Sequence, residues 1–214
     1  WPVMMLLSMF LYYFLKNDNV LSGLEGGVLF IGLIAFLLII LKKINKDVVI
    51  EEVDDALLVV SNFKIGLWLF IGALALYFGS EWLVQGSKDI ARSVGVSEAV
   101  IGVSLIAIGT SVPELAASVI AAAKQEKAIS LGNLMGSNIF NIGSVLGLTA
   151  MVKPIPVTEN SILSNDIYWM LGFAAVLIPL IFLHKRLQIS RWKGFVLVIA
   201  YGVFMFLLFT QGKL

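Results

Sequence analysis

The chain has 214 residues, of which 59% are hydrophobic and 14% are charged, and its formal net charge is +1. The charges lie in short clusters between long apolar runs, a pattern typical of membrane proteins. A net charge near zero, with no basic stripe interleaved with aromatic residues, gives no support to a nucleic-acid partner. The chain has no Cys, which excludes disulfides and thiolate metal ligands, so a bound cation would have to be held by oxygen.

Seven apolar runs are predicted to cross the lipid bilayer, because a transmembrane helix needs about 20 mostly apolar residues. The sequence therefore predicts an all-α, polytopic membrane protein. The first run is short and begins at Trp1 rather than at an initiator Met, so we expect the chain to be a piece of a longer protein. In chain order, the runs cover residues 2–15, 26–41, 65–84, 96–123, 130–151, 167–184 and 194–211.

The distribution of basic residues predicts the orientation. If all seven runs cross, the loops between them alternate sides, and five of the 15 Lys and Arg residues fall on one side. The other ten fall on the opposite side, which the positive-inside rule places in the cytoplasm. The five on the outer side are Lys16, Lys88, Arg92, Lys153 and Lys213.

Residues 42–64, between the second and third runs, mix acidic and basic side chains with scattered Val and Ile. This composition predicts a solvated cytoplasmic linker. A regulatory calcium-binding role for its acids is an open alternative, although they lack the alternating ligand spacing and central Gly of an EF-hand loop.

The fourth run carries the first candidate site. Pro113 has no N–H and crowds the carbonyl at Gly109, so we expect the helix to kink or open there. Thr110 and Ser111 precede Glu114 by four and three residues, which places their hydroxyls on one helical face with its carboxylate. An acid at the centre of a membrane helix costs roughly 2.5 to 3.5 kcal/mol, so Glu114 needs a cation or a partner. A cation-transport site is the first interpretation.

The fifth run is otherwise apolar but carries Asn133, Ser137, Asn138 and Asn141. Ser137 and Asn141 are four residues apart and face the same way on a helix. Either hydroxyl or amide alone could simply bond back to the preceding turn. Two GxxxG pairs in this run predict close helix packing: Gly132 with Gly136, and Gly143 with Gly147.

Other ionisable residues fit structural roles. Glu81 beside Trp82, and Glu25 at the start of a span, are expected to be interfacial anchors. His184 looks like a helix-end residue, and no nucleophile and base pair suggests a catalytic site. The sequence therefore predicts a protein that is not an enzyme.

Two long motifs on adjacent runs, GTSVPELAAS at 109–118 and GNLMGSNIFN at 132–141, closely resemble the second alpha-repeat of the sodium/calcium exchanger family, in the calcium/cation antiporter superfamily. The resemblance implies a ten-helix inverted-repeat antiporter fold, of which this chain would hold the last seven helices. Residues 1–41 would be the last two spans of the first half, 42–64 the cytoplasmic linker, and 65–214 the second half, with ion-binding motifs at 107–141.

By motif position, the resemblance also implies the ligands. Glu114 would be the main carboxylate, Thr110, Ser111 and Ser137 would supply hydroxyls, and Ala107 a backbone carbonyl. Asn141 falls where some relatives place an acid, so the site would carry one negative charge fewer. Calcium carries two positive charges, so a second carboxylate is expected from a missing amino-terminal repeat.

The function that the resemblance implies is secondary antiport of calcium for sodium across the cell membrane by alternating access, with these two ions transported and no cofactor. The neutral Asn141 leaves a calcium/proton antiporter open as an alternative. A cation channel subunit would use the same oxygens as a filter. A half-size antiporter working as an inverted homodimer would have to insert both ways, which the bias in basic residues disfavours.

Overall fold

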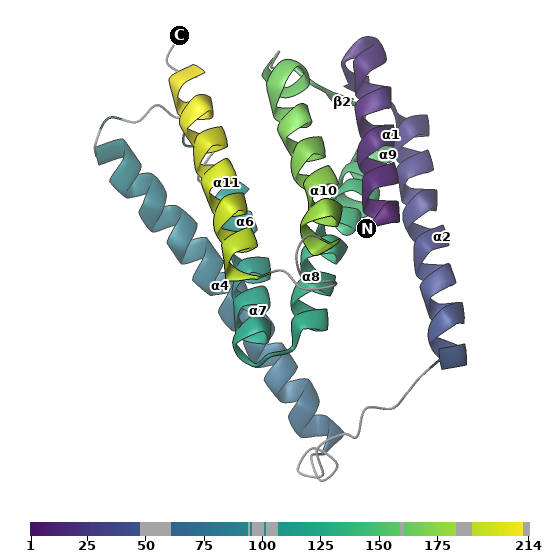
Figure 1. Cartoon of the computed structure of the whole chain (residues 1–214), viewed down its shortest axis with the longest axis vertical. Helices are drawn as coiled ribbons and strands as arrows, with labels where there is room; N and C mark the ends of the chain where they lie inside the picture. The colour runs from purple at the N-terminus through teal and green to yellow at the C-terminus, as the bar shows by residue number, and fades with distance from the viewer. Residues whose placement is uncertain are drawn as a thin grey trace. The chain divides into compact units, whose positions relative to one another are not determined.

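The computed structural model describes residues 1–47, 61–93, 95, 101, 107–158, 161–182 and 190–211. These residues are almost entirely helical, and the all-α prediction is confirmed (Figure 1). The longer helices are α1 (Pro2–Asp18), α2 (Gly23–Asp47), α4 (Asn62–Ser93), α7 (Val112–Ala123), α8 (Lys127–Phe140), α10 (Ile167–Phe182) and α11 (Arg191–Gln211). The shorter elements are α6 (Ala107–Thr110), α9 (Gly147–Val152), the π-helices η2 (Asn141–Leu146) and η3 (Ile162–Asp166), and the strands β1 (Val20–Leu21) and β2 (Ile155–Pro156).

Within the described residues, five helical segments are long and apolar enough to cross a membrane. They are Gly23–Lys43, Asn62–Ser93, Ala128–Val152, Ile162–Leu180 and Arg191–Leu208, and each overlaps one of the seven predicted runs. Of the other two runs, the first forms α1, whose 17 residues give a length of about 25 Å, short of a hydrocarbon core about 30 Å thick. The run at 96–123 lies partly outside the described residues.

Two helices extend beyond the predicted runs. The run at 65–84 is part of a longer helix, because α4 continues to Ser93 through residues that hydropathy alone excludes. There the Gln85 amide donates to the Asp89 carboxylate at 3.4 Å, and Asp89 pairs with Arg92 at 3.6 Å, one helical turn on. The ends of the predicted linker at 42–64 are also helical, since α2 runs to Asp47 and α4 begins at Asn62. The remainder of the linker, 48–60, lies outside the described residues.

The chain forms two compact units. The first contains Trp1–Lys46 and Leu131–Phe206, and the second contains Asp47–Ser130 and Leu207–Leu214. In the first unit, α1 runs toward the end that carries β2 and α2 runs back from it, whereas α10 runs away from that end and α11 returns toward it (Figure 1). Its core is formed by Met4, Leu7, Leu11 and Leu15 at the helical spacing on α1, packed with Leu29 and Leu33 of α2 and Ile139 and Ile142.

A short strand pair ties two helix connections of the first unit together. Asn19 adopts a left-handed conformation (φ 59°) that ends α1 and turns the chain into β1. β1 pairs antiparallel with β2, with Val20 opposite Pro156, and the Val157 N–H donates to the Asn19 carbonyl at 2.7 Å. The α1–α2 and α9–α10 connections are therefore held at the same end of the unit.

A capping box begins α2. The carboxylate of Glu25 accepts hydrogen bonds from the Ser22 N–H at 2.9 Å and the Ser22 hydroxyl at 2.8 Å. This S-x-x-E arrangement satisfies backbone and hydroxyl donors at the helix start. Glu25 therefore serves to start the helix.

Glycines let α2 cross the η2–α9 segment at backbone contact distance. A Cβ added at Gly26 would lie 2.6 Å from the Gly147 carbonyl oxygen and 2.7 Å from the Ala150 Cβ, and one at Gly143 would lie 2.7 Å from the Leu33 Cβ. The predicted close packing at Gly143 and Gly147 is confirmed. By contrast, a Cβ at Gly132 or Gly136 would meet no atom within 4 Å.

This crossing predicts opposite effects at two neighbouring glycines. Gly26→Ala should destabilise the protein by about 1 to 3 kcal/mol, because the new methyl group forces backbone apart in a packed crossing. Gly27→Ala is the matched control, since a Cβ at Gly27 meets nothing within 4 Å. The measurement is the thermal unfolding midpoint of each variant in detergent. Equal midpoints for the two variants would contradict the crossing.

Candidate functional site

The helix through the first motif is broken at Ser111. α6 ends at Thr110, Ser111 has φ −94° and ψ −1°, and α7 begins at Val112. Pro113 lies in the first turn of α7, where its missing N–H leaves no helical hydrogen bond unmade. The predicted opening of the helix around Pro113 is therefore confirmed, and it occurs two residues before the proline.

Glu114 lies in the first turn of α7. The positive end of a helix dipole favours a negative charge at this position. Its side chain is half-buried, and no hydrogen bond to its buried Oε2 atom is found among the described residues. Glu114, Thr110 and Ser111 each take part in at least one further interaction.

α4 supports the broken helix from one side. It contacts both α6 and α7, and Gly109 is buried against it. A Cβ at Gly109 would overlap the Val84 side chain of α4. The first glycine of the motif is thus required by close packing as well as by the bend that follows it.

The second motif lies on α8 and η2. The Ser137 hydroxyl donates to the Leu134 carbonyl at 3.3 Å, and the Asn138 amide donates to the same carbonyl at 3.0 Å. A hydroxyl that donates its hydrogen keeps its lone pairs, so Ser137 can still face a cation as an acceptor. Asn141 begins η2, and π-helical turns are frequent at functional sites because they widen the helix and shift its register.

A cavity of about 660 Å³ in the first unit borders this motif. Asn138 and Asn141 line it from one side and Ser8 of α1 from another, while the rest of the lining is apolar. Ser137 does not line this cavity, although it lies one helical turn from Asn141. Asn138 and Ser8 were not among the predicted site residues. Asn138 is three residues before Asn141 and therefore shares its helical face, a spacing that could have indicated its place beside the cavity.

The six predicted ligands are divided between the two compact units. Ala107, Thr110, Ser111 and Glu114 follow one another through α6 and α7 in the second unit, whereas Ser137 and Asn141 belong to the first. That all six bind one ion stays a prediction. Among the described residues, no group of three or more His, Cys, Asp and Glu side chains could hold a metal ion. A cation would therefore depend on hydroxyl, amide and carbonyl oxygens beside Glu114.

Comparison with known proteins decides the family. The family model described as sodium/calcium exchanger protein matches residues 64–210, which include all but the first two residues of α4, both motifs and all but the last residue of α11. The chain belongs to this family. It is an integral, multi-pass membrane protein, and its family is one of exchangers, which are transporters rather than enzymes.

Three relatives illustrate the match. A protein named as a candidate antiporter, CaxA of Alkalimonas amylolytica, is 35% identical over 99% of this chain and 67% of its own length. The sodium/calcium exchanger MaX1 of Methanosarcina acetivorans is 40% identical over 54% of the chain and 32% of its own length. The inner membrane protein YrbG of Escherichia coli is 30% identical over 67% of the chain and 43% of its own length. The chain thus spans less than half the length of the last two. No solved structure matches the chain significantly.

The contact between α4 and the motif predicts a compensating pair of substitutions. Gly109→Ala should lower stability, because its methyl group overlaps Val84, whereas Val84→Ala in the same chain makes room for it. In a double-mutant cycle measured by thermal unfolding in detergent, the two changes should therefore couple favourably by about 0.5 kcal/mol or more. Strictly additive effects would show that α4 does not support the motif in this way.

Proposed function

We propose that this chain carries the carboxy-terminal half of the ion site of a secondary antiporter that exchanges calcium for sodium. The break at Ser111 carries the proposal, because it sets a carboxylate and two hydroxyls beside interrupted helical backbone. Irregular backbone at membrane depth is tolerated where it faces protein, water or an ion, and broken helices of this kind form cation sites in transporters. Membership in the exchanger family supports this interpretation.

The donors suit hard cations. Calcium takes about six to eight oxygen ligands, and sodium likewise prefers oxygen to sulfur or nitrogen. We propose that Glu114 supplies the carboxylate, that Thr110, Ser111 and Ser137 supply hydroxyl oxygens, and that Ala107 supplies its carbonyl. The side-chain carbonyl of Asn141 completes this half of the site. The resemblance of both motifs to the second alpha-repeat, and membership in the family, support the proposal that the two motifs bind the same ion.

The charge of a calcium ion requires a second half of the ion site. One carboxylate balances half of the charge of calcium, and the rest must come from outside this set of residues. We propose that a facing inverted repeat, in a part of the protein beyond this chain, supplies a second carboxylate. The two repeats would then rock around the ion and expose it alternately to the two sides of the cell membrane.

The coupling ion is proposed to be sodium. MaX1, which is named a sodium/calcium exchanger, is 40% identical to this chain over about half of it. The neutral amide of Asn141 keeps proton coupling as the alternative, since it removes one negative charge from the site. Calcium uptake into vesicles under a sodium gradient at equal pH, compared with uptake under a pH gradient without sodium, separates the two.

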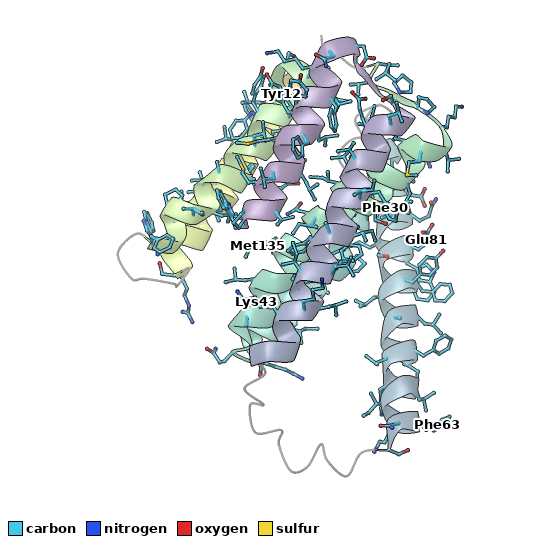
Figure 2. All side chains as sticks on the ribbon, turned by 90° about the vertical axis from the view of Figure 1, so that its right-hand side faces the viewer. Tyr12, Phe30, Lys43, Phe63, Glu81 and Met135 are labelled. Atoms are coloured by element: carbon cyan, nitrogen blue, oxygen red, sulfur yellow. The ribbon has the colours of Figure 1, made fainter. Side chains whose placement is uncertain are left out.

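The proposal predicts that Glu114→Gln, in the full-length protein, abolishes sodium-driven calcium flux while leaving membrane insertion intact. The substitution keeps the shape of the side chain and removes its charge. Glu81→Gln is the matched control, because it removes one negative charge from α4, outside both motifs (Figure 2). Flux in this control should stay within about twofold of wild type, because Glu81 is not among the proposed ligands. Calcium flux in vesicles is the measurement, and wild-type flux from Glu114→Gln would remove Glu114 from the site.

A further inference from the structure

A second cavity, of about 380 Å³, lies between α10 and α11 in the first unit. It contains neither Asn138 nor Asn141, so it is separate from the cavity beside the second motif. Phe173 of α10 and Leu197 of α11 line both cavities and form the wall between them. The proposed ion chemistry therefore gives this second cavity no role.

Most of this cavity suits a hydrocarbon chain. Along the two helices, apolar side chains line the cavity: Trp169, Val176 and Leu180 of α10, and Val196 and Ala200 of α11. Gly172 leaves part of it open, since a Cβ there would meet no atom within 4 Å. Both helices are membrane spans, so a groove between them at this depth meets acyl chains rather than water.

One end of the cavity is polar. Ser164 and Asn165 of η3 and Tyr168 of α10 line it there. The hydroxyl groups of Tyr168 and Tyr12 lie 3.1 Å apart, and the Lys16 ammonium lies 5.6 Å from the centre of the Tyr12 ring. Figure 2 shows Tyr12 on α1 beside α10 at this end of the unit. Tyrosines and lysines at the ends of spans typically sit at the level of lipid headgroups.

The same end also carries an acid. The Asn165 amide donates to the Asp166 carboxylate at 3.0 Å, and Asp166 is half-buried at the end of η3. Lys16 and Asp166 do not line the cavity themselves, but they lie beside its lining residues, Lys16 through Tyr12 and Tyr168, and Asp166 through Asn165. An ammonium and a carboxylate therefore border this end, and their charges match a headgroup that carries both signs.

We propose that the cavity between α10 and α11 binds one phospholipid with a phosphoethanolamine headgroup. Its acyl chain occupies the apolar length beside Trp169 and Gly172. Its phosphate lies toward Lys16 and the two tyrosine hydroxyls, and its primary ammonium donates to Asp166. A phosphatidylcholine has the same charges but no N–H donor, and a phosphatidylglycerol has no cation for Asp166.

The test uses the full chain reconstituted into vesicles in which part of the lipid carries bromine on its acyl chains. Bromine quenches tryptophan fluorescence on contact, and the difference between wild type and Trp169→Phe isolates the signal of Trp169. Half-maximal quenching is expected at a mole fraction of brominated phosphatidylethanolamine about fivefold lower than that of brominated phosphatidylcholine, because only the first can donate a hydrogen bond to Asp166. This readout is independent of ion transport.

Three substitutions locate the lipid preference within the cavity. Gly172→Leu fills the cavity and should abolish the preference, whereas Gly202→Leu, at an open position of α11 that does not line the cavity, should retain it. In Asp166→Asn, brominated phosphatidylethanolamine and brominated phosphatidylcholine should quench Trp169 equally at the same mole fraction. If Trp169 is quenched in proportion to mole fraction by both lipids, the lipid beside it is ordinary annular lipid, and the proposal of a specific site is wrong. A preference for brominated phosphatidylglycerol, no quenching of Trp169 by any lipid, or an unchanged preference in Gly172→Leu would each overturn the proposal.

Discussion

A carboxylate in apolar surroundings is costly unless the protein or an ion compensates its charge, and the local structure around Glu114 fits this constraint. The chain breaks its helix at Ser111, starts α7 with Pro113 in its first turn, and sets Glu114 where the helix dipole favours negative charge. Interrupted backbone also offers carbonyl oxygens that a continuous helix would use internally. The same few residues thus place the acid at a favourable helix end and leave carbonyl oxygens beside it, as the proposed cation site requires.

Close backbone packing holds the parts of the site in position. In the second unit, Gly109 lets α6 lie against Val84 of α4. In the first unit, Gly26 and Gly147 let α2 cross the segment that follows Asn141, and the β1–β2 pair ties the α9–α10 connection to the α1–α2 connection. Small residues serve this purpose in membranes because apolar side chains gain little from leaving lipid, so helices associate through close contact.

Patterns of one or a few residues predicted the main features of this protein. Five of the seven apolar runs coincide with spans among the described residues, Pro113 with Gly109 predicted the helix break, and Gly143 with Gly147 predicted a close crossing. Hydropathy could not predict the extension of α4 to Ser93, because polar side chains one turn apart continue that helix. The π-helix at Asn141 could not be predicted either, since it depends on packing against α2 and α1 rather than on local propensity. Asn138 and Ser8 border the cavity for the same reason, because tertiary packing brings α1 beside η2.

The central claim is that the two motifs supply oxygens to one cation site, and a metal bridge tests it most directly. The chain has no Cys, so Ser111→Cys and Ser137→Cys can be introduced into the full-length protein without background thiols from this region. Thiolates bind soft metals such as cadmium strongly, and two thiols that share a site bind one ion together. The account predicts that cadmium protects both thiols of the double variant from alkylation at concentrations that leave each single variant reactive. Equal alkylation of the double and single variants at every cadmium concentration would contradict it.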